Sequence, residues 1–397
     1  MKILVICQHY WPENFRVTEI CEELAARGHQ VTALVGRPNY PDGKIPPEYL
    51  HGQNRLQHRN GVEIRRVREI GRRPGKVGLA INYVSYMLPA CFQALRMGRK
   101  YDAVYAFSTS PVLMSVPAAL VRAVLGKKFL LYVLDIWPAC LAAMNVYEGS
   151  FLYAVMKKVS RWVYRRADIL VYSSHRFREY LQTVHQLEVP EEYYLPQFAD
   201  DIFDRELPNV SPHEGVQFVF AGNIGKMQSV QCLIRAAALL GEKPITWHIV
   251  GDGSDLEECK ALAHSLELGD TVRFYGRRPL EEMPAFYAMA DALLVSMKSD
   301  ISVNDTLPGK VQSYMAAGKP VLGAIAGEAA YVISDAGCGF CAEPDNPEAF
   351  RDAVLAFLKE KHPEEMGQRG REYYLRRFTK KRHMDTLEGL LKSLVGE

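Results

Sequence analysis

Residues 304–332 read NDTLPGKVQSYMAAGKPVLGAIAGEAAYV, and the order of their apolar, polar and glycine positions decides the fold. Apolar residues recur at helical spacing around Tyr314, and Gly318 stands where a helix ends, because glycine adopts the left-handed conformation at low cost. Pro320 then precedes a short apolar run typical of a buried strand. Gly327 leads into a further expected helix. The stretch therefore predicts loop, helix, strand and loop.

The last of these loops lies at the carboxyl end of the expected strand. Backbone N–H groups at a helix start have no intrahelical partner and carry the positive end of the helix dipole, which suits a phosphate. This nominates Gly327, Glu328 and Ala329 as an anion site. An ordinary amphipathic helix followed by a buried strand is the alternative, but it leaves the flanking glycine and acidic residues unexplained.

The same alternation of short apolar runs and amphipathic helices continues through the chain, which is typical of a doubly wound parallel sheet. From residue 195 the prolines, glycines and acidic residues crowd together without periodicity, and we place a domain boundary there. We predict an α/β fold of two Rossmann-like, doubly wound domains facing a cleft. They span residues 1–196 and 197–377, and residues 378–397 form a terminal helix.

Composition limits the classes of function. The chain has 397 residues, 48% of them hydrophobic and 24% charged, with a net charge of +2. A folded protein is expected, and nothing indicates general nucleic-acid binding. The eight cysteines and the absence of a secretory signal predict reduced thiols in a cytoplasmic protein. Cys338 and Cys341 form a C-x-x-C pair without a second pair, so no metal site is expected.

In the first half, the candidate residues follow the strands, because ligands of such sheets bind outside the carboxyl ends of the strands. The first strand leads into residues 9–16, and residues 36–44 form a turn-rich loop that could shape a binding site. Asp135 ends another strand; it is a candidate ligand contact or the cap of the next helix. Asn39, Tyr40 and Ser108 are further candidates at this edge.

Residues 65–100 combine arginines and lysines with an apolar, aromatic run. Polar interruptions make the run unconvincing as a membrane span. Basic flanks around aromatic and aliphatic residues fit a segment lying in the headgroup region of an anionic membrane. A core helix with a solvated basic face fits equally well.

In the second half, glycine turns follow two strands and allow a ligand to approach the backbone. The candidates in these turns are Gly222, Asn223, Gly225, Lys226, Gly251 and Gly253, and Arg277 and Arg278 follow the next strand. Without a full G-x-G-x-x-G after the first strand, a dinucleotide oxidoreductase is excluded.

The segment YMAAGKPV, residues 314–321, resembles the donor-binding segment of family-four retaining glycosyltransferases of the GT-B fold. In that family two acids eight residues apart precede the segment. Asp305 stands at the first position, where the resemblance implies a contact with the donor sugar. Ser313 stands at the second, where the family holds the nucleotide ribose. Lys310 would supply a diphosphate contact.

Other parts of the chain extend the resemblance. Asn223 and Gln228 stand where the family has an arginine and a lysine that clamp the donor diphosphate, which leaves Lys226 as the cation of that turn. The nucleotide base would stack near the turn of Arg277 and Arg278. Phe15 and Arg16 would contact donor or acceptor in the cleft, although a loop aromatic and a solvated arginine are also reasonable. Asp135 could orient a sugar hydroxyl, and Asn39, Tyr40 and Ser108 would lie on the acceptor side. The terminal helix would return to the first domain.

The order of parts resembles bacterial surface-polysaccharide transferases of the WbuB-like group. The resemblance implies transfer of a sugar, possibly an N-acetylated deoxy sugar, from a UDP-type nucleotide sugar in bacterial cell-surface glycan synthesis. The acceptor would be a lipid-diphosphate-linked glycan or a polysaccharide. No metal or other cofactor is expected, and the protein would lie on the cytoplasmic face of the inner membrane. A GT-B nucleotide-sugar epimerase and a non-catalytic scaffold subunit are the alternatives. The lack of an obvious acid/base pair counts against a two-carboxylate glycosidase.

Overall fold

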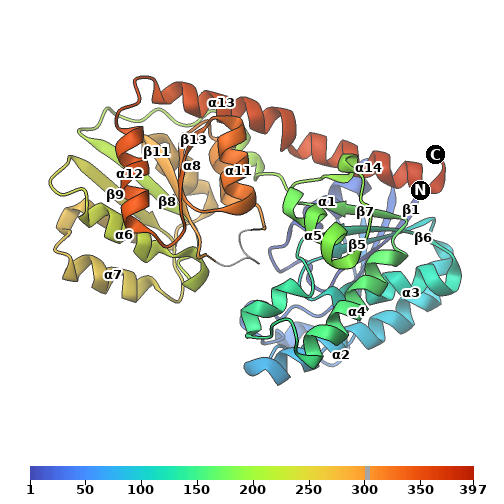
Figure 1. The fold of residues 1–397 in the computed structure, drawn as a ribbon. Helices are drawn as coiled ribbons and strands as arrows, with labels where there is room; N and C mark the ends of the chain where they lie inside the picture. Colours follow the sequence, from blue (N-terminus) through green and yellow to red (C-terminus); the bar gives the residue numbers. More distant parts are fainter. Residues whose placement is uncertain (300–304) are drawn as a thin grey trace. The chain divides into compact units, whose positions relative to one another are not determined.

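The computed structural model describes residues 1–299 and 305–397, so Asn304, where the decisive stretch begins, lies outside the described residues. The chain forms two compact units. Unit 1 contains Met1–Leu195 and Met384–Glu397, and unit 2 contains Pro196–His383. Each unit is built on one sheet covered by helices (Figure 1).

Unit 1 has a seven-stranded sheet in the order β3-β4-β2-β1-β5-β6-β7, parallel except for the antiparallel edge strand β3. The strands are β1 (Lys2–Ile6), β2 (Gln30–Val35), β3 (Leu56–Arg59), β4 (Val62–Arg66), β5 (Ala103–Ser108), β6 (Lys128–Val133) and β7 (Ile169–Tyr172). The helices are α1 (Arg16–Ala26), α2 (Gly75–Met97), α3 (Val116–Leu125), α4 (Phe151–Arg166), α5 (His175–His185) and most of α14 (Lys380–Val395).

Unit 2 has a six-stranded parallel sheet in the order β10-β9-β8-β11-β12-β13. The strands are β8 (Val216–Ala221), β9 (Ile245–Val250), β10 (Val272–Gly276), β11 (Ala292–Ser296), β12 (Val321–Ala324) and β13 (Gly339–Ala342). The helices are α6 (Val230–Ala238), α7 (Leu256–Ser265), α8 (Met283–Met289), α10 (Gly309–Ala316), α11 (Gly327–Ala336), α12 (Pro347–Phe357) and α13 (Pro363–Arg377). The predicted pair of doubly wound α/β units is confirmed.

The strand order fixes where each unit can bind a ligand. In unit 1 the chain builds the sheet outward from β1 in one direction and from β5 in the other, and in unit 2 the corresponding neighbours are β8 and β11. Ligands of open α/β sheets bind at such switch points, beyond the carboxyl ends of the strands. The fully buried strands β5 and β11 support these edges from within the two cores.

Helix α13 is absent from the sequence-based expectation, which has a single terminal helix from residue 378. Its sequence, PEEMGQRGREYYLRR, is mostly polar and contains two glycines, so its apolar periodicity is weak. The helix is nevertheless anchored by a few buried side chains, among them Met366 and Tyr374. Arg371 adds hydrogen bonds to the carbonyls of Ala316, at the end of α10, and of Phe203 and Asp204. The terminal helix itself begins at Lys380.

Candidate active site

The switch point of unit 2 holds a buried cation. Lys310 lies in the first turn of α10, and its Nζ is 3.9 Å from the centre of the Phe220 ring of β8. This Nζ is buried and has no hydrogen-bond partner among the described residues. Burial lowers the pKa of the ammonium to about 7, because the charged form loses its hydration. An unpaired buried cation is costly, so an anionic ligand at this place would stabilise the charged form of Lys310.

Tyr314 fixes α10, and therefore Lys310, at this edge of the sheet. Its buried hydroxyl accepts a hydrogen bond from the Ala221 N–H at 3.2 Å, and it lies 3.2 Å from the Ala221 carbonyl and 3.1 Å from the Leu294 carbonyl. One side chain thus ties the helix to the end of β8 and to the middle of β11. The sequence places Tyr314 on the helix and in the segment 314–321 that carries the resemblance, but predicts no such contact.

The two glycine turns of unit 2 pack against each other and against Lys310. Gly222 has a φ of 142°, and a β-carbon there would lie 3.0 Å from the Lys310 Nζ. Gly251 and Gly253 also have positive φ, and β-carbons would lie 1.8 Å from the Gly222 carbonyl oxygen and 2.4 Å from the Ile224 carbonyl oxygen. Only glycine fits these positions, and the packing leaves the Gly222 turn beside the cation.

Asn223 and Gln228, at the family's cation positions, bond to each other. Asn223 Nδ2 donates to Gln228 Oε1 at 2.8 Å, and a β-carbon at Gly225 would meet both side chains. Lys226 is exposed between them. A neutral pair therefore occupies the place of a charged clamp in this turn.

The remaining donor-side candidates of the decisive stretch lie around α10 and α11. The N-cap residue of α11, Ala326, provides no side-chain cap, and Gly327 is followed by the buried residues Glu328 and Ala329. The hydroxyl of Ser313 donates to the Gly309 carbonyl of its own helix at 3.2 Å. Asp305 is partly buried.

Arg277 and Arg278 follow β10, the edge strand of this sheet. Arg278 donates to the Tyr275 carbonyl at 3.1 Å and lies 3.8 Å from a Glu282 carboxylate oxygen. Both arginines are exposed, and two strands separate β10 from β11. They are thus the donor-side candidates furthest along the sheet from the switch point.

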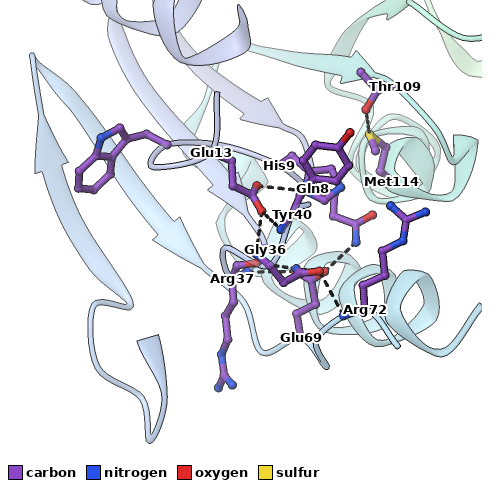
Figure 2. A network of polar contacts seen from close by, with 12 residues as sticks. Gln8, His9, Glu13, Gly36, Arg37, Tyr40, Glu69, Arg72, Thr109 and Met114 are labelled. Atoms are coloured by element: carbon purple, nitrogen blue, oxygen red, sulfur yellow. Dashed lines mark hydrogen bonds and ion pairs between the residues drawn. The ribbon is translucent and has the colours of Figure 1, made fainter. Parts of the chain in front are cut away.

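The switch point of unit 1 is a closed polar network (Figure 2). The Glu13 carboxylate accepts hydrogen bonds from the backbone N–H groups of Asn39 and Tyr40 at 2.7 and 2.6 Å, and its other oxygen lies 3.0 Å from the His9 ring nitrogen Nδ1. Glu13 is buried. A buried acid from the first loop therefore fixes the backbone of the turn-rich loop, a role the sequence analysis missed.

A second buried acid, Glu69, completes this network. Its carboxylate accepts hydrogen bonds from the side-chain amides of Gln8 at 2.7 Å, Asn82 at 2.7 Å and Asn39 at 3.0 Å, and from the Arg37 N–H at 3.0 Å. Burial raises the pKa of Glu69 to about 7, although the hydrogen bonds oppose the shift. Asn39 thus serves as part of the framework, with only 3% of its surface exposed.

Three aromatic rings lie over this network. The Phe15 ring stacks on His9 at 4.9 Å and meets the Tyr40 ring at 5.4 Å. Tyr40 is 48% exposed, so its ring offers a surface to a ligand while its backbone is held by Glu13. Arg16 forms an ion pair with Glu19 at 2.7 Å, one turn along α1.

Asp135 follows β6 and binds a neighbouring loop. Its carboxylate accepts a hydrogen bond from the Ser110 N–H at 2.7 Å, and burial raises its pKa. The next helical turn begins at Ala139 with Pro138 before it, so Asp135 is not a helix cap. Ser108, at the end of β5, is buried.

Residues 65–100 form strand β4 and helix α2. The inner face of α2 is buried, and its outer face carries apolar side chains at helical spacing, which we name the α2 stripe: Val77, Ile81, Val84, Leu88 and Phe92. Val77 is 74% and Phe92 68% exposed. None of the described helices is long and apolar enough to cross a membrane.

Among residues 1–299 and 305–397 no group of three or more histidine, cysteine or acidic side chains could hold a metal ion. Cys338 and Cys341 are free thiols, and burial raises the pKa of each to about 12. Thiols this reluctant to ionise are poor metal ligands.

Two family descriptions match successive parts of the chain. Residues 14–192 match "Glycosyl transferase 4-like domain", and residues 204–373 match "Glycosyl transferases group 1". Among curated proteins, the chain is 22% identical over 390 residues to a putative colanic acid biosynthesis glycosyl transferase, WcaI, of Escherichia coli; the match covers 91% of this chain and 93% of the relative. It is 27% identical over 263 residues to the probable glycosyltransferase WbjE of Pseudomonas aeruginosa, covering 63% of this chain and 64% of WbjE, a little under two thirds.

Solved structures share the fold at lower identity. Sucrose-phosphate synthase from Thermosynechococcus elongatus superposes with a TM-score of 0.76 at 16% identity, over 100% of this chain and 99% of that one. HepE from Anabaena, in complex with UDP, gives 0.73 at 16% identity, over 99% and 100%. Taken with the two sheets and their switch points, these matches show that the chain belongs to the group 1 glycosyltransferases, family four, with the GT-B fold.

Proposed function

We propose that this glycosyltransferase moves a sugar from a UDP-type nucleotide sugar to a lipid-linked acceptor, with retention of configuration at the sugar, in the synthesis of a bacterial cell-surface glycan. One observation carries the donor half of the proposal. The Lys310 ammonium is buried at the switch point of unit 2, beside the Gly222 turn, without a partner among the described residues. A diphosphate is the anion that such a site fits.

The chemistry needs charge stabilisation more than a base. As the bond from the sugar to the diphosphate breaks, negative charge grows on the departing phosphate, and groups already aimed there lower the barrier. Lys310, the backbone of the Gly222 turn and the start of α11 supply such groups. A phosphate oxygen of the donor can take the acceptor proton on the same face of the sugar, so no protein base is required.

Unit 1 offers the acceptor side. The exposed Tyr40 ring and the Phe15 ring stacked on His9 form an apolar surface of the kind that packs against a sugar face. Asp135 lies beyond β6 as an acceptor for hydroxyl groups. In this proposal Asp305 holds donor hydroxyls, and Ser313, at the ribose position, contributes little because its hydroxyl bonds to Gly309.

The relatives support the class of product. WcaI is named for colanic acid biosynthesis, and a mannosyltransferase of Mycobacterium tuberculosis, 26% identical over 255 residues, is named for a phosphatidylinositol monomannoside. HepE has been solved with UDP. We extend these substrate classes to this chain as a nucleotide-sugar donor and a lipid-linked acceptor.

The α2 stripe supports the proposal that the protein binds to an anionic membrane surface. The five positions span sixteen residues of α2, about 22 Å of helix at 1.5 Å per residue. Cations precede the stripe at Arg72, Arg73 and Lys76 and follow it at Arg96, Arg99 and Lys100, and none of them forms an ion pair with another residue that the structure describes. Apolar residues flanked by basic residues suit a helix lying in the headgroup layer on the cytoplasmic face of the inner membrane, where each nearby cation adds roughly 1 kcal/mol.

The test is a mass-spectrometric screen of nucleotide sugars against a lipid-diphosphate glycan acceptor. We expect a product one sugar heavier than the acceptor, made from a UDP-sugar. Product formed from donor alone would favour the epimerase. The Asn223–Gln228 pair is the observation that favours a non-catalytic subunit, and calorimetry decides that case: no UDP binding at millimolar concentration would overturn the proposal.

A further inference from the structure

Two adjoining cavities of unit 1 differ in chemistry and share one residue. The first, about 410 Å³, lies at the start of α2 and is lined by Arg72, Arg73 and Lys76 together with Leu79, Met144 and Asn145. The second, about 570 Å³, is almost wholly apolar. Lys76 lines both, so the basic cavity and the apolar groove meet at this residue.

The cations of the basic cavity are available to a ligand. None of the side chains of Arg72, Arg73 and Lys76 forms an ion pair or a hydrogen bond with a residue that the structure describes; only the backbone N–H of Arg72 is engaged, by Asn39 at 3.3 Å. No acidic side chain lines this cavity. Three unpaired cations around one cavity attract a multiply charged anion.

The groove continues from these cations along the α2 stripe. Its lining comes from Val77, Ala80, Ile81 and Val84 of α2 and from Leu152 in the first turn of α4, and the two helices lie next to each other in Figure 1. Leu152 is 47% exposed, and its neighbour Phe151 is 86% exposed. An exposed apolar surface of this kind marks a binding site for an apolar partner.

We propose that the two cavities together bind a prenyl diphosphate, with the diphosphate among Arg72, Arg73 and Lys76 and the first isoprene units in the groove between α2 and α4. The inference rests on the proposed function, because it gives the lipid-linked acceptor its place on this chain. An anionic phospholipid matches the groove less well, since a single phosphodiester charge does not need three cations.

The basic cavity also lies near the acceptor-side candidates of the same unit. Arg72, which lines this cavity, donates its backbone N–H to the side-chain oxygen of Asn39 at 3.3 Å. Asn39 belongs to the buried network at the switch point of unit 1. A sugar attached to the bound diphosphate would therefore extend toward the switch point of unit 1.

The test uses farnesyl diphosphate as the probe, with the full chain and tryptophan fluorescence as the readout of binding. Farnesol and inorganic diphosphate serve as arms that lack the head or the tail. We expect Arg73→Gln with Lys76→Gln to weaken farnesyl diphosphate binding at least about tenfold, equivalent to about 1.4 kcal/mol. We expect Ala80→Trp, which fills the groove, to weaken farnesyl diphosphate but not inorganic diphosphate.

The matched control is Arg99→Gln with Lys100→Gln, which removes the same charge at the other end of α2. If both pairs weaken farnesyl diphosphate binding equally, the basic cavity is no more than the general anionic-membrane contact of the α2 stripe, and the inference is wrong. Failure of the proposed function would give a different result. Wild-type protein would bind farnesyl diphosphate and the Arg73→Gln with Lys76→Gln variant would not, yet the wild-type protein would transfer no sugar.

Discussion

The two switch points of this chain differ in how their buried charges are satisfied. In unit 1, Glu13 and Glu69 accept hydrogen bonds from neighbouring segments of the same unit, so both buried carboxylates have protein partners. In unit 2, the Lys310 ammonium is buried without a partner among residues 1–299 and 305–397. The buried charges of unit 1 hold its loops in place, whereas the buried charge of unit 2 lacks a partner in the part of the chain that the structure describes. We therefore expect mutations in unit 1 to lower stability and mutations in unit 2 to lower the rate of sugar transfer.

The largest expected effect is on turnover at the edge of unit 2. We expect Lys310→Met to lower the rate of sugar transfer about 10²- to 10³-fold, because it removes a cation aimed at the developing phosphate charge. The free energy of unfolding should hold or rise, since a buried unpaired ammonium is lost. Steady-state kinetics and urea denaturation measure the two quantities on the same protein.

Lys319 provides the matched control for that variant. It belongs to the same stretch, but its Nζ donates to the carbonyls of Ala288 and Ala290 at 2.9 and 2.8 Å. Lys319→Met should lower the free energy of unfolding by about 1–3 kcal/mol and leave turnover of the folded enzyme near that of the wild type. Equal kinetic loss in both variants would remove the special role of Lys310.

At the edge of unit 1 we expect substitutions to lower the free energy of unfolding more than they lower turnover. Glu13→Ala leaves the N–H groups of Asn39 and Tyr40 without their buried acceptor, which should cost about 2–4 kcal/mol in the free energy of unfolding. The loop carrying Tyr40 should then exchange its amide hydrogens faster. Hydrogen exchange followed by mass spectrometry measures this, and unchanged protection of residues 37–43 would contradict the framework role.

The pKa of Lys310 sharpens the comparison further. Because that pKa is about 7 in the free protein, the amine is mostly neutral at pH 8 and mostly charged at pH 6. A bound diphosphate favours the charged form, so UDP binding should take up close to one proton at pH 8, and much less at pH 6. Calorimetry in two buffers of different ionisation enthalpy measures the uptake. The Lys310→Met substitution should abolish this proton uptake. If the uptake persists in the variant, the proton binds to a group other than Lys310.

The smallest expected effect concerns the neutral pair of the Gly222 turn. Asn223→Arg with Gln228→Lys introduces the two charges that the resemblance implies for these positions and breaks one side-chain hydrogen bond. Since the pair is exposed to solvent, we expect UDP binding to tighten only about two- to fivefold. Fluorescence titration checks it, and a loss of affinity would indicate that the neutral pair shapes the turn for the donor.

The sequence predicted the fold well because the strands near the switch points are short, apolar and fully buried, as in β5 and β11. It nominated Lys310 and the Gly222 turn, which the structure brings together. The sequence did not predict the network of Glu13 and Glu69, because its members are up to 74 residues apart in the chain. No local pattern links Gln8 to Asn82. The one available signal was an acid, Glu13, inside an otherwise aromatic loop.

The polypeptide passes between the units twice, once after Leu195 and again after His383. The segment Met384–Glu397 buries Leu387 and Leu391 in unit 1, and Glu388 pairs there with Arg27 at 2.9 Å and His29 at 3.1 Å. Unit 2 is thus an insertion within a discontinuous host. A fragment that ends at residue 195 lacks Met384–Glu397, so the apolar surface of unit 1 that this segment covers would be exposed and the fragment would aggregate. A protein in which a flexible linker replaces residues 196–383 would retain both segments of unit 1.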